Sequence, residues 1–400
     1  MKALELFVGA GGLALGVSRA GFKHEAVVEL DAEACATIRE NQRRLVAHVR
    51  DWPLYQGDVR ELRYSGIRGD LDLLAAGAPC QPFSFGGKGL GDLDQRNMFP
   101  EVLRAVLELE PRAVLIENVK GLTSSRFRPY LDYIILRMTY PHLSTQDGET
   151  WASHLKRLQE IHSTGLDVAK YNVKYCVLNA ADFGVPQWRE RVFIVGFRAD
   201  LGIWWESPQP THSLDELLRA QWFDGSYWAD HDLPKRHHLK LAKRYANRLR
   251  YLRLQGGVAK SRLKRWNTIR DAITNLPKIR IGSVAKGVEN HFLNPGARKY
   301  QKHTGSRLDE AAKTLKAGSH GVPGGENMLQ LDDGRVRYFS VRECARLQTF
   351  PDEYVFSGAW TRCMRQLGNA VPVRLGEIVA ETIKEQLEAL HIRSDRSSVG

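Results

Sequence analysis

Residues 3–16 read ALELFVGAGGLALG, and this stretch decides the fold that we predict. The apolar run at its start is typical of a short buried strand, and the glycines that follow favour a tight turn leading into a helix that ends near Arg19. Glycines let the backbone approach a ligand closely, and the first turn of a helix presents free N–H groups and the positive end of its dipole. The stretch therefore predicts a ligand site where the strand ends.

A second predicted strand, residues 26–28, ends in Glu29. An acid about 20 residues beyond such a turn is where a pair of ribose hydroxyls is held in nucleotide-binding folds. Residues 56–59 close a third strand and offer Asp58 at the same edge. Strands that alternate with helices predict an α/β fold with a doubly wound parallel sheet. Because Gly9, Gly11 and Ala14 also fit the dinucleotide fingerprint, an NAD-dependent enzyme is an alternative.

The stretch 77–84 reads GAPCQPFS and follows the apolar run 71–76. We predict a buried strand that delivers Cys80 to a sharp turn at its carboxyl end. Pro79 and Pro82 fix φ on both sides of the thiol, which holds it in one direction and favours a nucleophile. Taken alone, Cys80 fits better the role of most free cysteines, which fill a core as small hydrophobes. The glycine-rich residues 85–91 are predicted to close over a substrate, with an ordinary flexible connection as the alternative.

Two later strands carry charged groups toward the same edge. Residues 113–116 lead into Glu117, and we expect desolvation to raise its pKa so that it holds a proton near neutrality. A helix cap is the alternative for this carboxylate. Arg189 and Arg191 are two residues apart, so in an extended chain they project to one face. Paired guanidiniums suggest an anion or a polarised carbonyl oxygen as ligand, with a solvated edge as the alternative.

The net charge of +12 is concentrated in one part of the chain. Residues 201–340 hold 25 Lys and Arg against 13 Asp and Glu, whereas the remaining residues balance. Thirteen basic residues and no acidic residue lie between Lys235 and Arg270, where apolar side chains recur at near-helical spacing. This asymmetry favours a module that meets a phosphate backbone, with a polar turn at 318–327 suited to base edges. A solubilising surface and a calmodulin-type or membrane-surface helix are the alternatives.

Length and composition limit the class of protein. A chain of 400 residues exceeds what one core usually supports, so we expect two domains or a large insertion. No run approaches the ~18 apolar residues of a membrane span, and the first residues lack a signal-peptide pattern, so we expect a cytoplasmic protein. The five cysteines include no Cys-x-x-Cys pair, which argues against a disulfide framework and a zinc site. We expect reduced thiols and no metal.

Six motifs occur in order, and together they resemble those of the cytosine-5 DNA methyltransferases, especially the bacterial modification enzymes. The motifs are Phe7-x-Gly9-x-Gly11-Gly12, PCQPFS at 79–84, ENV at 117–119, Gln187-x-Arg189-x-Arg191, RE-x-ARLQ at 342–348 and GNAVP at 368–372. The match covers residues 3–200 and 340–390, and the basic segment falls where this family places its variable target recognition domain. The insertion at 123–170 is longer than in small members of the family.

The resemblance implies a Rossmann-like S-adenosylmethionine-dependent methyltransferase sheet with a smaller, mixed, basic target recognition domain. We expect a catalytic and cofactor-binding domain at 1–200, the target recognition domain at 201–338, and a return to the catalytic domain at 339–400 with disordered last residues. The expected product is 5-methylcytosine in a short duplex DNA sequence, formed by a monomer in the bacterial cytoplasm at the nucleoid. The resemblance also implies a linked restriction endonuclease.

The resemblance further implies roles for single residues. Cys80 would add to C6 of a flipped-out cytosine, Glu117 would contact N3 and the exocyclic amine, and Arg189, supported by Arg191, would bind O2. S-adenosylmethionine would be bound by Phe7, Gly9, Gly11, Gly12, Leu13, Glu29, Asp58, Val59, Pro79, Asn369 and Ala370. DNA would be contacted by Gln81, Ser84, Lys88, Arg96, Lys235, Arg236, Lys243, Arg244 and His320. An RNA cytosine-5 methyltransferase acting on tRNA and a non-catalytic DNA-binding regulator are the alternatives, and the recognition sequence does not follow from the residues.

Overall fold

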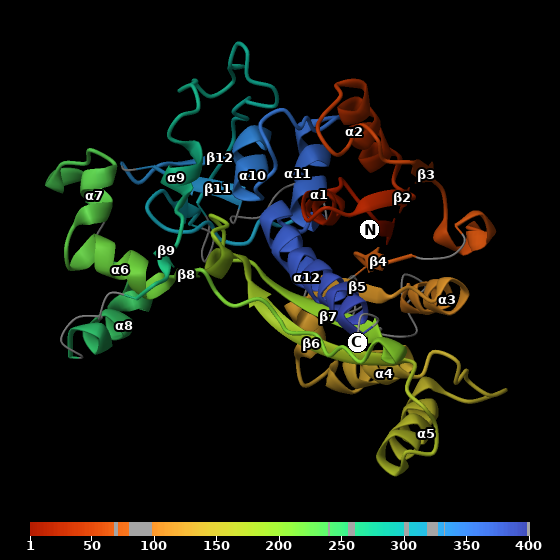
Figure 1. Ribbon diagram of the computed structural model, residues 1–400. Coiled ribbons are helices and arrows are strands. Elements are labelled where there is room, and N and C mark those ends of the chain that lie inside the picture. The colour runs from red at the N-terminus through yellow and green to blue at the C-terminus, as the bar shows by residue number, and fades with distance from the viewer. Residues whose placement is uncertain are drawn as a thin grey trace. The chain divides into compact units, whose positions relative to one another are not determined.

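The chain forms two compact units in the computed structural model, which describes residues 1–67, 71–79, 98–238, 241–254, 261–299, 304–317, 327–331 and 333–397 (Figure 1). Unit 1 comprises Met1–Leu178, Glu190–Pro208 and Gly376–Gly400, and unit 2 comprises Asn179–Arg189 and Gln209–Leu375. The domain boundaries that we expected at residues 201 and 339 stay predictions.

Unit 1 is built on a seven-stranded sheet with the order β3-β2-β1-β4-β5-β7-β6. Its strands are β1 (Lys2–Leu6), β2 (Lys23–Glu29), β3 (Leu54–Gln56), β4 (Leu73–Ala76), β5 (Ala113–Val119), β6 (Tyr171–Asn179) and β7 (Glu190–Arg198). The first five strands pair in parallel, and β7 runs antiparallel to β5. The chain winds outward from β1 in one direction and from β4 in the other, so the predicted doubly wound α/β fold is confirmed.

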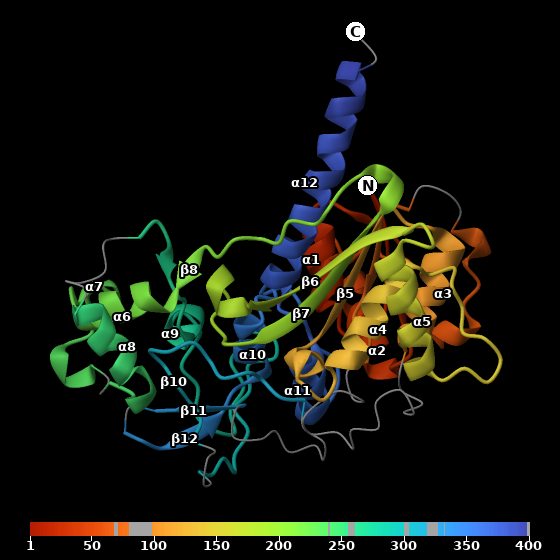
Figure 2. The same ribbon diagram turned by 90° about the horizontal axis from the view of Figure 1, so that it is seen from below.

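Helices cover the sheet because its central strands are buried and mostly apolar on both faces. Figure 2 shows α3 (Phe99–Leu109) and α4 (Arg128–Thr139) beside the sheet. Alternate residues of three central strands pack with these two helices in one core, and they are Leu4, Leu6, Leu74, Ala76, Val114 and Ile116. The helices of unit 1 are α1 (Gly12–Arg19), α2 (Ala32–Arg43), α3 (Phe99–Leu109), α4 (Arg128–Thr139), α5 (Trp151–Thr164) and the greater part of α12 (Val373–Ser397). A Cβ added at Gly376 of α12 would lie 3.1 Å from Cδ1 of Leu13, so α12 and α1 approach closely.

Two parts of unit 1 extend what the sequence indicates. In residues 123–170, where we recognise no motif, the sequence predicts a helix at about 151–162, and the structure has α5 there. Helix α5 pairs with α4 through a core of Leu136, Tyr140, Leu155 and Leu158. The sequence predicts a final helix at about 373–390, and α12 runs on to Ser397. No glycine or proline interrupts residues 391–397, so the sequence there lacks a stop signal.

Unit 2 consists of short helices and strands around aromatic side chains. Its helices are α6 (Leu214–Trp222), α7 (Ser226–Asp230), α8 (Lys243–Leu254), α9 (Ile269–Ile273), α10 (Val341–Leu347) and α11 (Trp360–Asn369). Strands β8 (His212–Ser213) and β9 (Lys264–Arg265) pair with each other, and β10 (Ser306–Arg307), β11 (Met328–Gln330) and β12 (Val336–Tyr338) form a second small sheet. A core of Leu217, Tyr227, Trp228 and Trp266 holds α6 and α7 together. Unit 2 is thus the smaller of the two units, and it mixes short helices with short strands.

Candidate active site

Four neighbouring strands of unit 1 bring predicted site residues into one row. The strands β2, β1, β4 and β5 are in register at their last shared pairs. The residues that follow these pairs therefore lie side by side across the carboxyl edge of the sheet, and they are Glu29, Phe7, Gly77 and Glu117. The winding reverses between β1 and β4, and ligands of open α/β sheets bind outside such a reversal. The row is therefore the candidate active site.

The turn after β1 has an unusual backbone. Phe7, Gly9 and Gly11 have φ values of 59°, 55° and 81°, all in the left-handed region. Glycine adopts this region freely, whereas a residue such as Phe7 is strained there by about 1–3 kcal/mol, a strain that concentrates at functional sites. Among the residues that the structure describes, no atom would lie within 4 Å of a Cβ added at Gly9. The turn therefore leaves open space beside its backbone.

The Glu29 carboxylate lies against this turn. Its Oε2 accepts a hydrogen bond from Gly9 N at 2.7 Å, and its Oε1 accepts from Leu30 N at 2.9 Å and Asp31 N at 2.7 Å. Burial raises the pKa of Glu29, although these backbone hydrogen bonds act in the opposite direction. A carboxylate has about four acceptor sites. Acceptor capacity therefore remains on Oε2, on the side of the glycine turn.

Helix α1 starts directly after the turn and has no capping side chain. Gly11 is the N-cap residue, and the first turn holds no acidic residue. The first four N–H groups of a helix have no partner within it. Gly12 and Leu13 therefore begin a helix whose positive end is not neutralised by its own side chains, and an anionic group is favoured there.

Asp58 shapes the turn after β3. It caps the short helix Val59–Glu61 through a hydrogen bond from Arg60 N at 2.9 Å, and it also pairs with the Arg60 guanidinium. These hydrogen bonds from Arg60 hold the pKa of Asp58 below its ordinary value. Val59 is buried. The predicted contact of these two residues with an adenine stays a prediction.

Glu117 and Arg191 form a buried ion pair. Nε of Arg191 lies 2.7 Å from Oε1 of Glu117, and both side chains are at most 10% exposed. In the antiparallel pair β5 and β7, Glu117 is opposite Phe193 and Val119 is opposite Arg191. The two charged residues are therefore diagonal neighbours on one face of the sheet. Sheet register thus fixes the pair at the end of the row.

Arg189 has different partners, although it is only two residues from Arg191. Its guanidinium is fully buried in unit 2 and donates to the carbonyl oxygens of Leu315 at 2.9 Å, Gly368 at 2.6 Å and Ala370 at 2.8 Å. Charged donors make strong hydrogen bonds to carbonyls, and the planar guanidinium can serve several at once. Arg189 therefore ties distant backbone segments of unit 2 together, whereas Arg191 pairs with Glu117 in unit 1.

Gln187 and Gly368 belong to the same arrangement in unit 2. Nε2 of Gln187 donates to Leu347 O at 3.3 Å, and its Oε1 accepts from Leu315 N at 3.0 Å. A Cβ at Gly368 would lie 2.2 Å from Ala317 N, so only glycine allows this close approach. The predicted cofactor residues that follow Gly368 are Asn369, which is exposed, and Ala370, which is buried. Both belong to unit 2, whereas the other predicted cofactor residues belong to unit 1.

Sequence reasoning gave no role to Asn118, which the structure places beside the row. The side chain is buried, and its Nδ2 donates to Ala78 O at 3.2 Å while its Oδ1 accepts from Val119 N at 2.9 Å. Asn118 therefore anchors residues 77–79, which lead directly to Cys80. The sequence signals were its place in the ENV motif at 117–119 and its position as a polar residue next to Glu117 near the end of a largely apolar strand.

The comparisons with known proteins agree with the geometry. A family model described as C-5 cytosine-specific DNA methylase matches residues 1–140 and 143–385. The chain belongs to this family. The resemblance that we drew from the six motifs is confirmed.

Relatives of this DNA methylase match along most of its length. The type II methyltransferase M.Eco47II of Escherichia coli is 32% identical over 397 residues, which cover 98% of this chain and 80% of the relative. M.PspPI of Psychrobacter sp. (strain TA137) is 31% identical over 389 residues, which cover 96% and 79%. The solved structure of the S. pombe Dnmt2 methyltransferase covers 98% of this chain and 99% of its own, with a TM-score of 0.54 and 18% identity. The last likeness concerns the fold alone.

Some predicted features of the DNA methylase lie outside the described residues. They are the glycine-rich loop 85–91, most of the turn 318–327, and the site residues Cys80, Gln81, Ser84, Lys88, Arg96 and His320. Lys235, Arg236, Lys243 and Arg244 are described and exposed in unit 2. Among the residues that the structure describes, no group of three or more His, Cys, Asp or Glu could hold a metal ion. No helix in that part of the chain is both long and apolar enough to cross a membrane.

Proposed function

We propose that this DNA methylase transfers a methyl group from S-adenosylmethionine to C5 of a cytosine in a short duplex DNA sequence. The observation that carries the proposal is the buried pair of Glu117 and Arg191, which ends a row that begins at Glu29. The names of the relatives support a place in a type II restriction-modification system. A linked restriction endonuclease would recognise the same sequence, and methylation would protect it.

The nucleophile in this proposal is Cys80. Cytosine C5 is a poor nucleophile, so the thiolate adds to C6 and the electron pair of the C5–C6 double bond becomes available at C5 for bonding to the methyl carbon. Loss of the C5 proton and expulsion of the thiolate then restore the double bond. The role of Cys80 rests on its motif and on Asn118, which anchors the segment before it.

Glu117 supplies the acid side of the reaction. A carboxyl group at N3 of the base protonates or hydrogen-bonds the ring and withdraws electrons from C6, which accelerates thiolate addition. The ion pair with Arg191 holds the carboxyl group in one orientation. The raised pKa that we expect for Glu117 stays a prediction.

We assign the contact with O2 of the base to Arg191. A guanidinium has five N–H donors, more than its contacts with Glu117 and the carbonyl of Glu190 require. Arg189 donates instead to three backbone carbonyls. It is a positioning residue in this proposal, and the two arginines of the motif have separate functions.

The row fits the cofactor that the family implies. S-adenosylmethionine would supply an electrophilic methyl group, whose bond to the sulfonium sulfur would break as the bond to C5 forms, with a neutral thioether as the leaving group. Glu29 has remaining acceptor capacity for a ribose hydroxyl, and the uncapped start of α1 at Gly12 and Leu13 suits the methionine carboxylate. Open space at Gly9 allows close approach to the turn that contains Phe7. The remaining predicted cofactor residues are Asp58, Val59, Pro79, Asn369 and Ala370.

Bisulfite sequencing of plasmid DNA from cells that express the chain tests this function. The expected result is one short sequence in which a cytosine resists conversion, and its loss in the Cys80→Ala variant. Purified protein should also transfer labelled methyl groups to duplex DNA and not to tRNA. A folded protein that binds S-adenosylmethionine and protects no cytosine contradicts the proposal, and transfer to tRNA alone would favour an RNA methyltransferase.

A further inference from the structure

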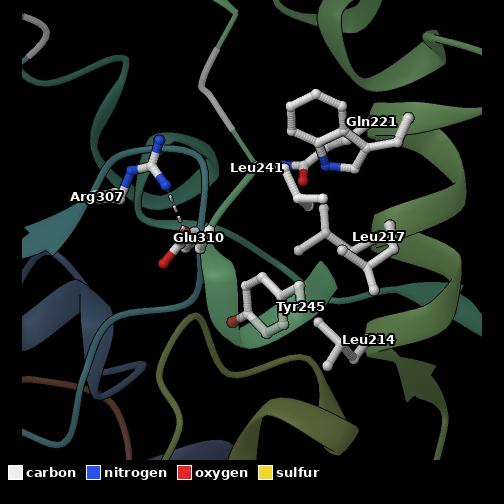
Figure 3. Close-up of a pocket in the computed structure, with 10 residues that line it drawn as sticks. Leu214, Leu217, Gln221, Leu241, Tyr245, Arg307 and Glu310 are labelled. Carbon is white, nitrogen blue, oxygen red and sulfur yellow. Dashed lines mark hydrogen bonds and ion pairs between the residues drawn. The ribbon is translucent and has the colours of Figure 1, made fainter. Parts of the chain in front are cut away.

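Helix α8 of unit 2 carries five basic residues and no acidic residue. Its inner row consists of Leu249 and Leu252, which are buried, and Tyr245, which is half-buried. Figure 3 shows Tyr245 across from Leu214 and Leu217 of α6. The cavity in this seam has a volume of about 10 Å³, room for one water molecule at most. The inner row is therefore helix packing and not a ligand site.

One flank of α8 is attached to unit 2 by ion pairs. Arg244 pairs with Glu310, whose other partner Arg307 lies 3.2 Å away (Figure 3). Arg248 pairs with Asp215 at 2.5 Å. Arg244, which we predicted as a DNA contact, is thus engaged with a carboxylate that is only 10% exposed. A phosphate would have to compete with this carboxylate for its guanidinium.

The outer row of α8 differs from this flank. We define it as Lys243, Asn247 and Arg250, whose spacing places them on one face opposite the buried leucines. All three are exposed. Within the described residues, no carboxylate forms an ion pair with Lys243 or Arg250, in contrast to Arg244 and Arg248. The two cations of the outer row are therefore available to an external anion.

We propose that the outer row of α8 binds the phosphate backbone of duplex DNA, while Arg244 and Arg248 hold the helix on unit 2. This inference rests on the proposed function. Lys243 and Arg250 are about 10 Å apart along the helix axis, a distance that spans about three nucleotides of one strand, so they would meet different phosphates. The amide of Asn247 between them is a further donor to phosphate oxygen. Backbone contacts of this kind position the protein and carry no sequence information.

The test compares how salt weakens DNA binding in matched double variants of the full chain. Binding of a labelled duplex is followed by fluorescence anisotropy over a series of salt concentrations. Each phosphate contact contributes about 0.9 to the magnitude of the slope when the logarithm of the DNA-binding constant is plotted against the logarithm of the salt concentration. The K243A/R250A variant should therefore lower the magnitude of this slope by about 2. The charge-retaining K243R/R250K should keep the original slope. K23A/K156A removes two exposed cations of unit 1 and should leave the slope unchanged.

A second comparison tests whether Arg244 and Arg248 stabilise the fold and the outer row does not. R244A/R248A should lower the thermal unfolding midpoint, whereas K243A/R250A should not, because only the first variant breaks ion pairs within unit 2. An unchanged slope in folded K243A/R250A overturns the inference. The inference is also overturned if K23A/K156A lowers the slope as much as K243A/R250A does. It is overturned as well if K243A/R250A loses binding to phosphatidylserine vesicles but keeps its binding to DNA. If the slope falls but no cytosine is methylated, the DNA contact stands and the proposed function fails.

Discussion

Arg191 Nε lies 2.7 Å from Glu117 Oε1, and the pair joins two antiparallel strands of unit 1. Neither side chain is more than 10% exposed, so each charge depends on the other for compensation. The pair can therefore affect two different measurements. The carboxyl group of Glu117 affects the rate of the reaction, and the ion pair with Arg191 affects the stability of the fold.

The first prediction concerns Glu117. We expect Glu117→Gln to slow methyl transfer by about 10²–10⁴-fold, because the amide is isosteric but cannot supply a proton. Single-turnover transfer to duplex DNA measures the rate, and calorimetric titration measures the affinity for S-adenosylmethionine, which should not change. A variant with nearly normal turnover would remove Glu117 from the chemistry.

The second prediction separates the two arginines of the motif. Arg189→Lys should lower the thermal midpoint more than Arg191→Lys, because one ammonium cannot reach the three carbonyls of Leu315, Gly368 and Ala370. Arg191→Lys should lower kcat more than Arg189→Lys at a temperature where both variants are folded. If Arg191→Lys lowered the thermal midpoint more and Arg189→Lys lowered kcat more, Arg189 and not Arg191 would be the residue that contacts the base.

The third prediction concerns Asn118, whose amide group donates to Ala78 O. Asn118→Asp keeps the shape but replaces the donor with an acceptor, so segment 77–79 should lose its anchor. Single-turnover methyl transfer should slow by at least tenfold, with little change in cofactor affinity, because Cys80 is less well oriented. Asn118→Ala should behave in the same way. Normal rates in both variants would show that the anchor is dispensable.

The fourth prediction is a pH dependence of stability that arises from His154 in α5. The side chain is buried and lies 3.1 Å from the Tyr133 hydroxyl. Burial, assisted by the charges of Arg137 and Arg157, lowers the pKa of His154 to about 4. The unfolded chain binds this proton below its ordinary pKa of about 6.5, whereas the folded chain does not. Stability is therefore fully present above pH 6.5 and falls as the pH drops toward 4.

Thermal unfolding between pH 7.5 and 4.5 measures this effect. His154→Gln removes the titrating group, so its midpoint should fall less steeply over the same range. The matched control is His142→Gln, since His142 lies on the surface with Asp167 as its partner. If the thermal midpoint of His154→Gln fell with pH as steeply as that of the unmodified protein, His154 would not be the source of the pH dependence.

Local signals in the sequence predict much of the fold. Alternating apolar runs and glycine turns indicate strands of a doubly wound sheet, and the acid after the second strand indicates the position of Glu29. The order of the strands and the antiparallel direction of β7 follow only from the structure. The different roles of Arg189 and Arg191 could not be predicted, because they depend on carbonyls more than 120 residues away in sequence. The same holds for the neighbours Lys243 and Arg244, since only the fold brings Glu310 to one of them. Asn118 was missed because its partner Ala78 lies 40 residues away in sequence, in the segment that follows β4.

The division of the chain into units bears on how the enzyme can be recombined. Unit 2 contains the short segment Asn179–Arg189 in addition to the long segment Gln209–Leu375. A chimera that exchanges only the long segment for that of a relative would leave Gln187 and Arg189 facing foreign carbonyls. Transplanting both segments together preserves those contacts. An exchange of unit 2 between relatives is therefore made most safely with both segments together, including the connection between β6 and β7.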